Sequence, residues 1–279
     1  MNKGMVVSVI FALMHSSSVF AQDFEYHPIL SDNLIISLGA FKSNNSFKIS
    51  AEGDLGDGIE DEINFGKAIG VDESTTLFYG LMRWKFGKTR KWSLFGGYFD
   101  ADSSGEAVLT EDVEWQDFIY KEGSFVGAGV GIAVTRVFIG RSFVKNQQHD
   151  FGVGVGIHNL DLNAFIEGEV SIDDATTDFR RGDASSNQPL PNVGIWYNYS
   201  PARKWLIHAR VDWISASIDE YDGSLWNTAV GVNYQAFPHV GFDLAFTYFD
   251  LNLNVDKSVW QGGIDMSYSG PVFSVTTNW

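Results

Sequence analysis

Apolar and polar residues alternate with a period of two in one segment of this chain after another. Residues 205–213 are one example, in which every second residue is apolar, and the apolar members are Trp205, Ile207, Ala209, Val211 and Trp213. Residues 226–234 and 240–248 repeat the pattern. Successive side chains of a β-strand point to opposite faces, so this period indicates strands with one apolar and one polar face. The pattern predicts an all-β chain.

The ends and the polar faces of these segments indicate which kind of β-protein they form. Aromatic residues mark both ends of the apolar stripe, as Trp205 and Trp213 do, and amphipathic rings take that position at a membrane interface. The opposite face mixes Gly with Asp, Arg and Asn, which suits a narrow polar lumen. These features favour an antiparallel transmembrane β-barrel over the alternative, a soluble sandwich or lipocalin-like barrel. The chain has no cysteine, so its stability must come from closure and packing rather than disulfides.

The first 21 residues have the pattern of a cleaved signal peptide. Lys3 provides a basic start, residues 5–14 form an apolar run, and small residues precede a predicted cleavage between Ala21 and Gln22. The apolar run is about half of the roughly 20 residues that a membrane-spanning helix needs. We therefore predict a signal peptide over residues 1–21 and a single barrel domain over residues 22–279.

The connections between the predicted strands alternate between short and long. Short turns are expected at residues 87–90, 145–149, 200–204 and 237–239. Long acidic segments are expected at residues 53–74, 104–125 and 166–188, with shorter ones at 219–223 and 250–257. Outer-membrane barrels have short periplasmic turns and longer external loops, so this alternation predicts the two sides.

The strand count depends on residues 43–45 and 269–271. If both are tight turns, the barrel has about twelve strands and both termini lie on the external side. If both are bulges inside long strands, it has ten and the termini lie in the periplasm, their usual position. The apolar face changes parity near residues 269–271, and the extra residue of a bulge produces such a change. We favour ten strands, with twelve as the alternative.

The net charge of −16 excludes nucleic acid as a partner, because that requires a basic surface. Acidic residues concentrate in the predicted loops, at residues 54–62, 111–114, 173–178 and 219–222. Divalent cations that bridge lipopolysaccharide phosphates could associate loosely with these loops. Their acidic residues lack the spacing of a dedicated calcium loop, and we expect no metal site and no cofactor.

The alternation, the signal peptide and the aromatic final residue of residues 271–279 resemble small Gram-negative outer-membrane β-barrels, broadly of the OmpA and OmpW kind. Residues 221–224, 237–250 and 268–271 are similar to an uncharacterised family of such proteins. The resemblance spans most of the mature chain. It implies an outer-membrane location, contact with outer-membrane lipid and lipopolysaccharide, and recognition by the barrel-insertion machinery. The implied C-terminal insertion signal is Phe273, Val275 and Trp279, where Trp replaces the more usual Phe.

Several ionisable residues are predicted to point into the lumen. They are His208, Arg210, Asp212, Asp243, His158, Asp161 and Arg83. A histidine beside carboxylates could act as a general base. The favoured alternative is a polar network that fills the interior, because interior polar residues are expected in this fold. A barrel of about ten strands is only slightly wider than one that side chains fill, so we expect a plugged lumen.

The sequence therefore predicts a non-enzymatic outer-membrane barrel with a structural, envelope-related or small-solute role. One alternative is a narrow channel or a receptor for a small ligand. The other is an enzyme that modifies lipid or cleaves protein at the cell surface. Ten-stranded proteases of this membrane place acidic residues and a histidine at the external mouth. The predicted external segments contain acids but no histidine, because His27 precedes the barrel while His149 and His239 lie at short turns.

Overall fold

The structure is a computed structural model that describes residues 26–53, 61–63, 74–109, 113–115, 118–173, 176–218, 221–257 and 260–279. The predicted signal peptide, with Ala21 and Gln22, lies outside these residues, and so do parts of the acidic loops. Within the described part of the chain, no helix is long and apolar enough to cross a membrane.

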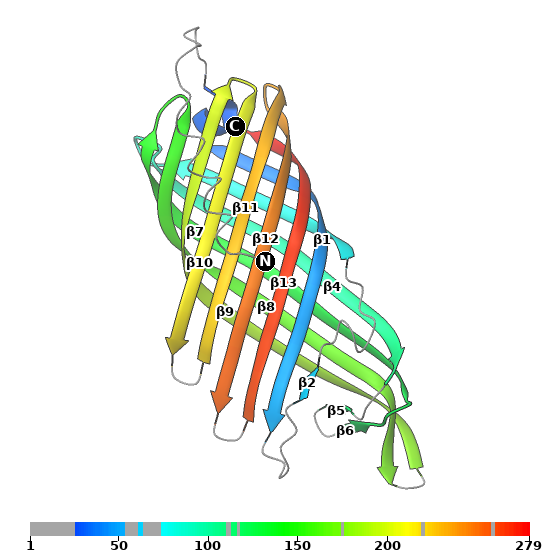
Figure 1. Cartoon of the computed structure of the whole chain (residues 1–279). Coiled ribbons are helices and arrows are strands. Elements are labelled where there is room, and N and C mark those ends of the chain that lie inside the picture. The colour runs from blue at the N-terminus through cyan, green and yellow to red at the C-terminus, as the bar shows by residue number, and fades with distance from the viewer. Residues whose placement is uncertain are drawn as a thin grey trace, which may run out of the picture.

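Ten long antiparallel strands form one closed barrel (Figure 1). They are β1 (Leu34–Gly53), β3 (Ser74–Phe86), β4 (Trp92–Val108), β7 (Phe125–Lys145), β8 (His149–Asp173), β9 (Thr176–Ala202), β10 (Trp205–Ile218), β11 (Tyr221–Phe237), β12 (Val240–Lys257) and β13 (Trp260–Asn278). Each pairs with the next, and β13 pairs with β1 to close the barrel. The prediction of ten strands is confirmed, and the alternative of twelve is wrong.

Four short elements accompany the barrel. The strand β2 (Asp61–Ile63) adds to β1, while β5 (Val113–Trp115) and β6 (Phe118–Tyr120) form a hairpin between β4 and β7. The helix α2 (Pro28–Ser31) precedes β1. Main-chain hydrogen bonds join Leu34 to Trp279 in both directions, so the first described residues and the C-terminus meet. They lie at the barrel end with the short turns, which we call the turn end, and the opposite end is the loop end (Figure 1).

The two predicted bulges are absent. Residues 43–45 lie inside β1 and residues 269–271 inside β13, so neither is a turn. The pairing of these strands has the same register on both sides of the site, with Phe41 opposite Val272 and Asn44 opposite Ser269. The long strands were predicted correctly, but the bulge that was to explain the change of parity was wrong. The apolar side chains instead move from one face to the other along a regular strand.

This change of face follows from a change in what surrounds the barrel. On β13, Phe273 and Val275 point outward and are exposed, whereas Met266 and Tyr268 are buried inside. On β4, Tyr98 points outward, and the next outward positions toward the loop end are Asp100 and Asp102. An apolar exterior suits hydrocarbon and a polar exterior suits water, so the apolar residues lie inside wherever water surrounds the barrel.

The apolar part of the exterior forms a belt bounded by two aromatic girdles. The turn-end girdle contains Trp84, Trp92, Trp205 and Tyr234, and the loop-end girdle contains Tyr98, Trp213, Trp226 and Tyr248. On β10 the two girdles are roughly 26 Å apart along the strand at about 3.3 Å per residue. A transmembrane barrel has an apolar band of this kind, flanked by aromatic residues at both interfaces.

Beyond the belt, toward the loop end, the barrel interior is an apolar core. Its buried residues, the loop-end core, are Phe41, Leu77, Phe99, Ala101, Ile132, Val134, Leu160, Leu162, Leu225, Ala245, Phe249, Leu251, Met266, Tyr268 and Val272. Phe99 packs edge-to-face on Phe41 and Phe249, with ring centroids 6.1 and 5.6 Å apart. Such packing fills the interior at this level.

The seam between β1 and β13 leaves no room for a side chain at Gly39. A Cβ atom added there would collide with the main-chain carbonyl of Phe273. We expect Gly39→Ala to destabilise the barrel on the order of 1–3 kcal/mol, because closure must shift to accommodate the methyl group. The readout is the fraction of unboiled protein that migrates as the folded form on a denaturing gel during a urea titration.

Gly80→Ala on the adjacent strand β3 is the matched control. The atom nearest to its added Cβ is in the side chain of Phe78, at 3.4 Å, so we expect little change. Equal urea midpoints for both variants would contradict a tight seam at Gly39.

Candidate functional site in the barrel lumen

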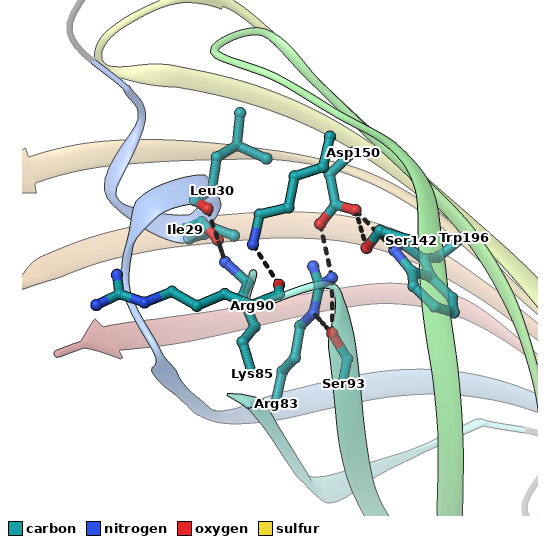
Figure 2. A network of polar contacts seen from close by, with 10 residues as sticks. Ile29, Leu30, Arg83, Lys85, Arg90, Ser93, Ser142, Asp150 and Trp196 are labelled. Atoms are coloured by element: carbon teal, nitrogen blue, oxygen red, sulfur yellow. Dashed lines mark hydrogen bonds and ion pairs between the residues drawn. The ribbon is translucent and has the colours of Figure 1, made fainter. Parts of the chain in front are cut away.

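A first polar network, the turn-end network, surrounds a buried ion pair between Arg83 and Asp150 (Figure 2). The Arg83 Nη2 atom is 2.6 Å from Asp150 Oδ2, and both side chains are almost fully buried. Arg83 also donates to Ser93 Oγ from Nε and Nη2, at 3.2 and 3.1 Å. Ser142 Oγ and Trp196 Nε1 donate to Asp150 Oδ1 at 2.6 and 3.3 Å. The carboxylate therefore has partners on both oxygens.

Aromatic rings surround the same guanidinium. Arg83 lies over Phe95 and Trp196, with 4.9 and 5.5 Å from its Cζ atom to the ring centroids. These residues come from β3, β4 and β9, whose period-two alternation turns all three side chains into the lumen. Cation–π contact stabilises a guanidinium that is shielded from water.

A second polar network lies on Asp212, further from the turn end. Arg136 binds its carboxylate in a bidentate manner, with Nε 2.6 Å from Oδ2 and Nη2 2.8 Å from Oδ1. The Nε atom of Arg210 is 3.6 Å from Oδ2, and His158 Nε2 is 3.8 Å from the same oxygen. We call these four residues the Asp212 network. Two arginines thus share one carboxylate, and Arg136 has the better geometry.

Two amides hold the ring of His158. Its Nδ1 atom is 3.2 Å from Asn192 Oδ1, and its Nε2 atom is 3.0 Å from Asn227 Nδ2. These contacts fit a neutral imidazole that donates from Nδ1 and accepts at Nε2. With that tautomer, His158 is fully hydrogen-bonded and fills the lumen.

A third pair, His208 and Asp243, lines an internal cavity. His208 Nε2 is 2.8 Å from Asp243 Oδ2. The cavity has a volume of about 110 Å³, and Arg83 and Arg210 also line it. Its remaining wall is mainly apolar, with Ile35 among the contributors. The cavity is large enough for several water molecules.

The helix α2 closes the turn end of the lumen. Lys85 is buried and donates from Nζ to the main-chain oxygens of Ile29 and Leu30, the latter at 3.0 Å (Figure 2). Ile29 and Leu30 also pack on Ile35 and Leu206 inside the barrel. A buried cation therefore fixes an apolar plug through its carbonyl groups.

The predicted lumen residues are distributed over these networks. His208, Arg210 and Asp212 lie on the inward face of β10, as alternation on one strand requires. His158 joins the Asp212 network, Asp243 pairs with His208, and Arg83 belongs to the turn-end network.

Asp161 is a correction. It is exposed and points outward, because it lies three residues after His158 in a continuous strand and therefore on the opposite face. The predicted C-terminal insertion residues Phe273, Val275 and Trp279 are exposed on the outer surface.

Sequence analysis missed Asp150 and α2. Asp150 directly follows a predicted turn at residues 145–149, which concealed its place in β8. Alternation from Phe151 onward was the available signal, because it puts Asp150 on the same face as Gly152. The helix has only four residues, too few for a helical period to be visible.

Comparison with known proteins identifies the fold. The chain is similar to the outer-membrane protease OmpT from Escherichia coli, with 10% sequence identity, a TM-score of 0.57 and coverage of 89% of this chain and 97% of that one. The chain has the fold of Gram-negative outer-membrane β-barrels.

Two further barrels show lower similarity. The toluene transporter TodX from Pseudomonas putida has 7% identity, a TM-score of 0.35 and coverage of 91% and 93%. Ail, the attachment invasion locus protein of Yersinia pestis, has 9% identity, a TM-score of 0.25 and coverage of 87% and 99%. No protein-family model matches the sequence, and no curated protein matches it at a significant level.

The arrangement of the three clusters is that of a filled interior. Each lumen carboxylate described above is paired with an arginine or a histidine. In the described ranges, no group of three His, Asp or Glu side chains is arranged to hold a metal ion. Such pairing satisfies charges that would otherwise be costly inside the barrel.

Removing the shared carboxylate should strongly destabilise the barrel. Asp212→Asn leaves Arg136 and Arg210 without a buried counter-charge, and we expect a loss of about 3–5 kcal/mol in the free energy of unfolding. Urea titration in detergent with tryptophan fluorescence measures this loss. Asp178→Asn is the control, because Asp178 pairs with Arg180 at 2.7 Å on the surface, where both side chains are 47% exposed. We expect about 1 kcal/mol or less there, and equal losses would contradict a specific role for the Asp212 network.

The docking of α2 should depend on pH through His27. This residue caps α2, with Nδ1 accepting a hydrogen bond from the Ile29 amide at 3.2 Å. Burial lowers the pKa of His27 from 6.5 to about 4, against a smaller opposite effect of the Lys204 main chain. The undocked segment therefore binds a proton more readily. Docking is strongest above about pH 6.5 and loses roughly 3 kcal/mol as the pH falls to 4.

Hydrogen exchange measures this effect as amide protection factors for residues 28–34 at pH 7.5 and pH 5. We expect protection to fall at pH 5 in the wild-type chain. His27→Asn retains a capping oxygen but does not titrate in this range, so its protection should stay constant. The same fall in both proteins would assign the pH dependence to another group.

Proposed function

We propose that this chain is a closed, non-enzymatic β-barrel of the Gram-negative outer membrane with a structural, envelope-related role. The observation that carries the proposal is a lumen filled at three successive levels. At the turn end, Lys85 fixes α2. In the middle, Arg136 and Asp212 form a bidentate ion pair, and the loop-end core fills the interior beyond it.

The membrane location is supported by the exposed apolar belt. Leu244, Phe246 and Phe273 are neighbours on β12 and β13, and 55–60% of each is exposed. Soluble monomers rarely expose a continuous apolar surface of this extent. In the membrane this surface contacts lipid, and lipopolysaccharide surrounds the residues beyond the loop-end girdle. The proposal includes Phe273, Val275 and Trp279 as the signal for the barrel-insertion machinery, and divalent cations at the acidic loops.

The positions of the histidines support a non-enzymatic role. OmpT is a protease, but the likeness of this chain to OmpT concerns the fold. Of the 6 histidines, the structure describes all but His15. His158 and His208 lie in the lumen, and the other described histidines lie at the turn end, in or beside the short connections. The described part of the loop end thus has acidic residues without a histidine to act as a base.

A small-ligand receptor is the second candidate, and the cavity beside Arg210 is the observation that favours it. Arg210 Nε has no hydrogen-bond partner although it is buried, and the side chain borders the cavity. A small anion in the cavity would provide that partner.

The closed barrel should not conduct. Purified protein in planar lipid bilayers is expected to give no reproducible single-channel steps, because the three barriers lie in series along the lumen. The same preparation must first fractionate with the outer membrane and migrate as a folded barrel, so that inactivity is not a result of misfolding. Regular steps that change in size with Arg210→Ala or Asp212→Asn would overturn the closed reading.

A further inference from the structure

Basic side chains gather at the turn end of this otherwise acidic protein. The turns and strand ends there contain Lys88, Arg90, Lys91, Arg141, Lys145, Arg203 and Lys204, all exposed or half-buried. The chain as a whole has a net charge of −16, so this end has the opposite sign. Among the described residues near it, Asp32 is hydrogen-bonded to Asn278 and Asp150 is buried against Arg83.

The basic residues lie on one side of the barrel. They belong to the β3–β4, β7–β8 and β9–β10 connections, which are neighbours in the sheet, with Trp92 opposite Arg141 and His149 opposite Tyr199. Residues 237–239, between β11 and β12, contain no lysine or arginine, and neither do the turn-end segments of β1 and β13. The charge therefore forms an arc over about half of the perimeter.

Two of these cations lie on the outer wall rather than on the end surface. The guanidinium of Arg141 is 5.8 Å from the ring centroid of Trp92, and Lys204 Nζ is 5.9 Å from that of Tyr234. Both rings belong to the turn-end girdle. In a membrane, such a girdle lies at the level of the lipid headgroups. The cations thus have the height of lipid phosphates.

We propose that this basic arc, defined by Lys88, Lys91, Arg141 and Lys204, binds anionic phospholipid headgroups of the periplasmic leaflet on one side of the barrel. A phospholipid with a net negative charge satisfies several cations at once, whereas a zwitterionic headgroup also has a cation of its own. Peptidoglycan is the other acidic material in the periplasm. It would contact the end surface, and the wall positions of Arg141 and Lys204 favour lipid.

The proposal rests on the membrane location given above but not on the closed lumen. Lipid binding can be tested on the full chain, folded in detergent micelles, by titration with phosphatidylglycerol or phosphatidylcholine. Native mass spectrometry then counts the lipids retained per barrel. We expect the wild-type chain to retain phosphatidylglycerol at concentrations at which phosphatidylcholine is lost, and added salt should weaken the binding.

The decisive variant combines Lys88→Gln, Lys91→Gln, Arg141→Gln and Lys204→Gln. Each basic residue near an anionic surface contributes about fivefold in affinity, so we expect at least a tenfold loss for phosphatidylglycerol. The matched control removes the same charge at the loop end through Lys42→Gln, Lys121→Gln, Arg180→Gln and Arg181→Gln, and it should bind as the wild type does. Heat-modifiable migration of both variants confirms that they are folded.

Three results would overturn the proposal: equal retention of the two lipids by the wild type, unchanged affinity in the arc variant, or an equal loss in the control. If isolated peptidoglycan binds the wild type and not the arc variant, while lipid affinity is the same, the arc belongs to peptidoglycan instead. A barrel that fractionates with the membrane but shows no lipid preference contradicts only this inference. A chain recovered outside the membrane contradicts the proposed function as well.

Discussion

Hydrocarbon offers no hydrogen-bond partner to the main chain, so every amide and carbonyl in a lipid-facing strand must be paired within the protein. An open sheet would leave two unpaired edges in the membrane. The pairing of β13 with β1, from Ile35 and Asn278 to Gly53 and Trp260, removes both edges. The rest of the molecule depends on this seam, because closure gives every strand an inside and an outside.

Closure also explains why the same strand has opposite polarity at its two ends. Within the apolar belt the inside is polar, and the buried charges are paired, as Arg83 is with Asp150. Beyond Tyr98 and Tyr248 the outside meets water, and the inside becomes an aromatic and aliphatic core around Phe99. The barrel therefore resembles a membrane protein over one part of its length and a soluble protein over another, with no break in the hydrogen bonding between them.

This dual character sets the limit of prediction from the sequence. Alternation was sufficient for the strands, the turns and the inward face of β10, because it depends only on strand geometry. It failed at residues 269–271, where a change of apolar face was interpreted as an extra residue although the surroundings had changed instead. Asp161 was misplaced for the same reason. The partner of Asp212 could not be predicted, because Arg136 is 76 positions away and alternation says nothing about which strands face each other across the lumen.

The lengths of β8 and β9 have a consequence for what other molecules meet. β8 has 25 residues, or roughly 80 Å along the strand at about 3.3 Å per residue. Its outward apolar residues end at Ile157, and Asn159 begins the polar part, so more than half of the strand extends past the lipid (Figure 1). The hairpin of β8 and β9 is thus a rigid mast. It raises its tip above the sugar layer that covers neighbouring barrels, into the region where antibodies, phages and host surfaces make their first contact.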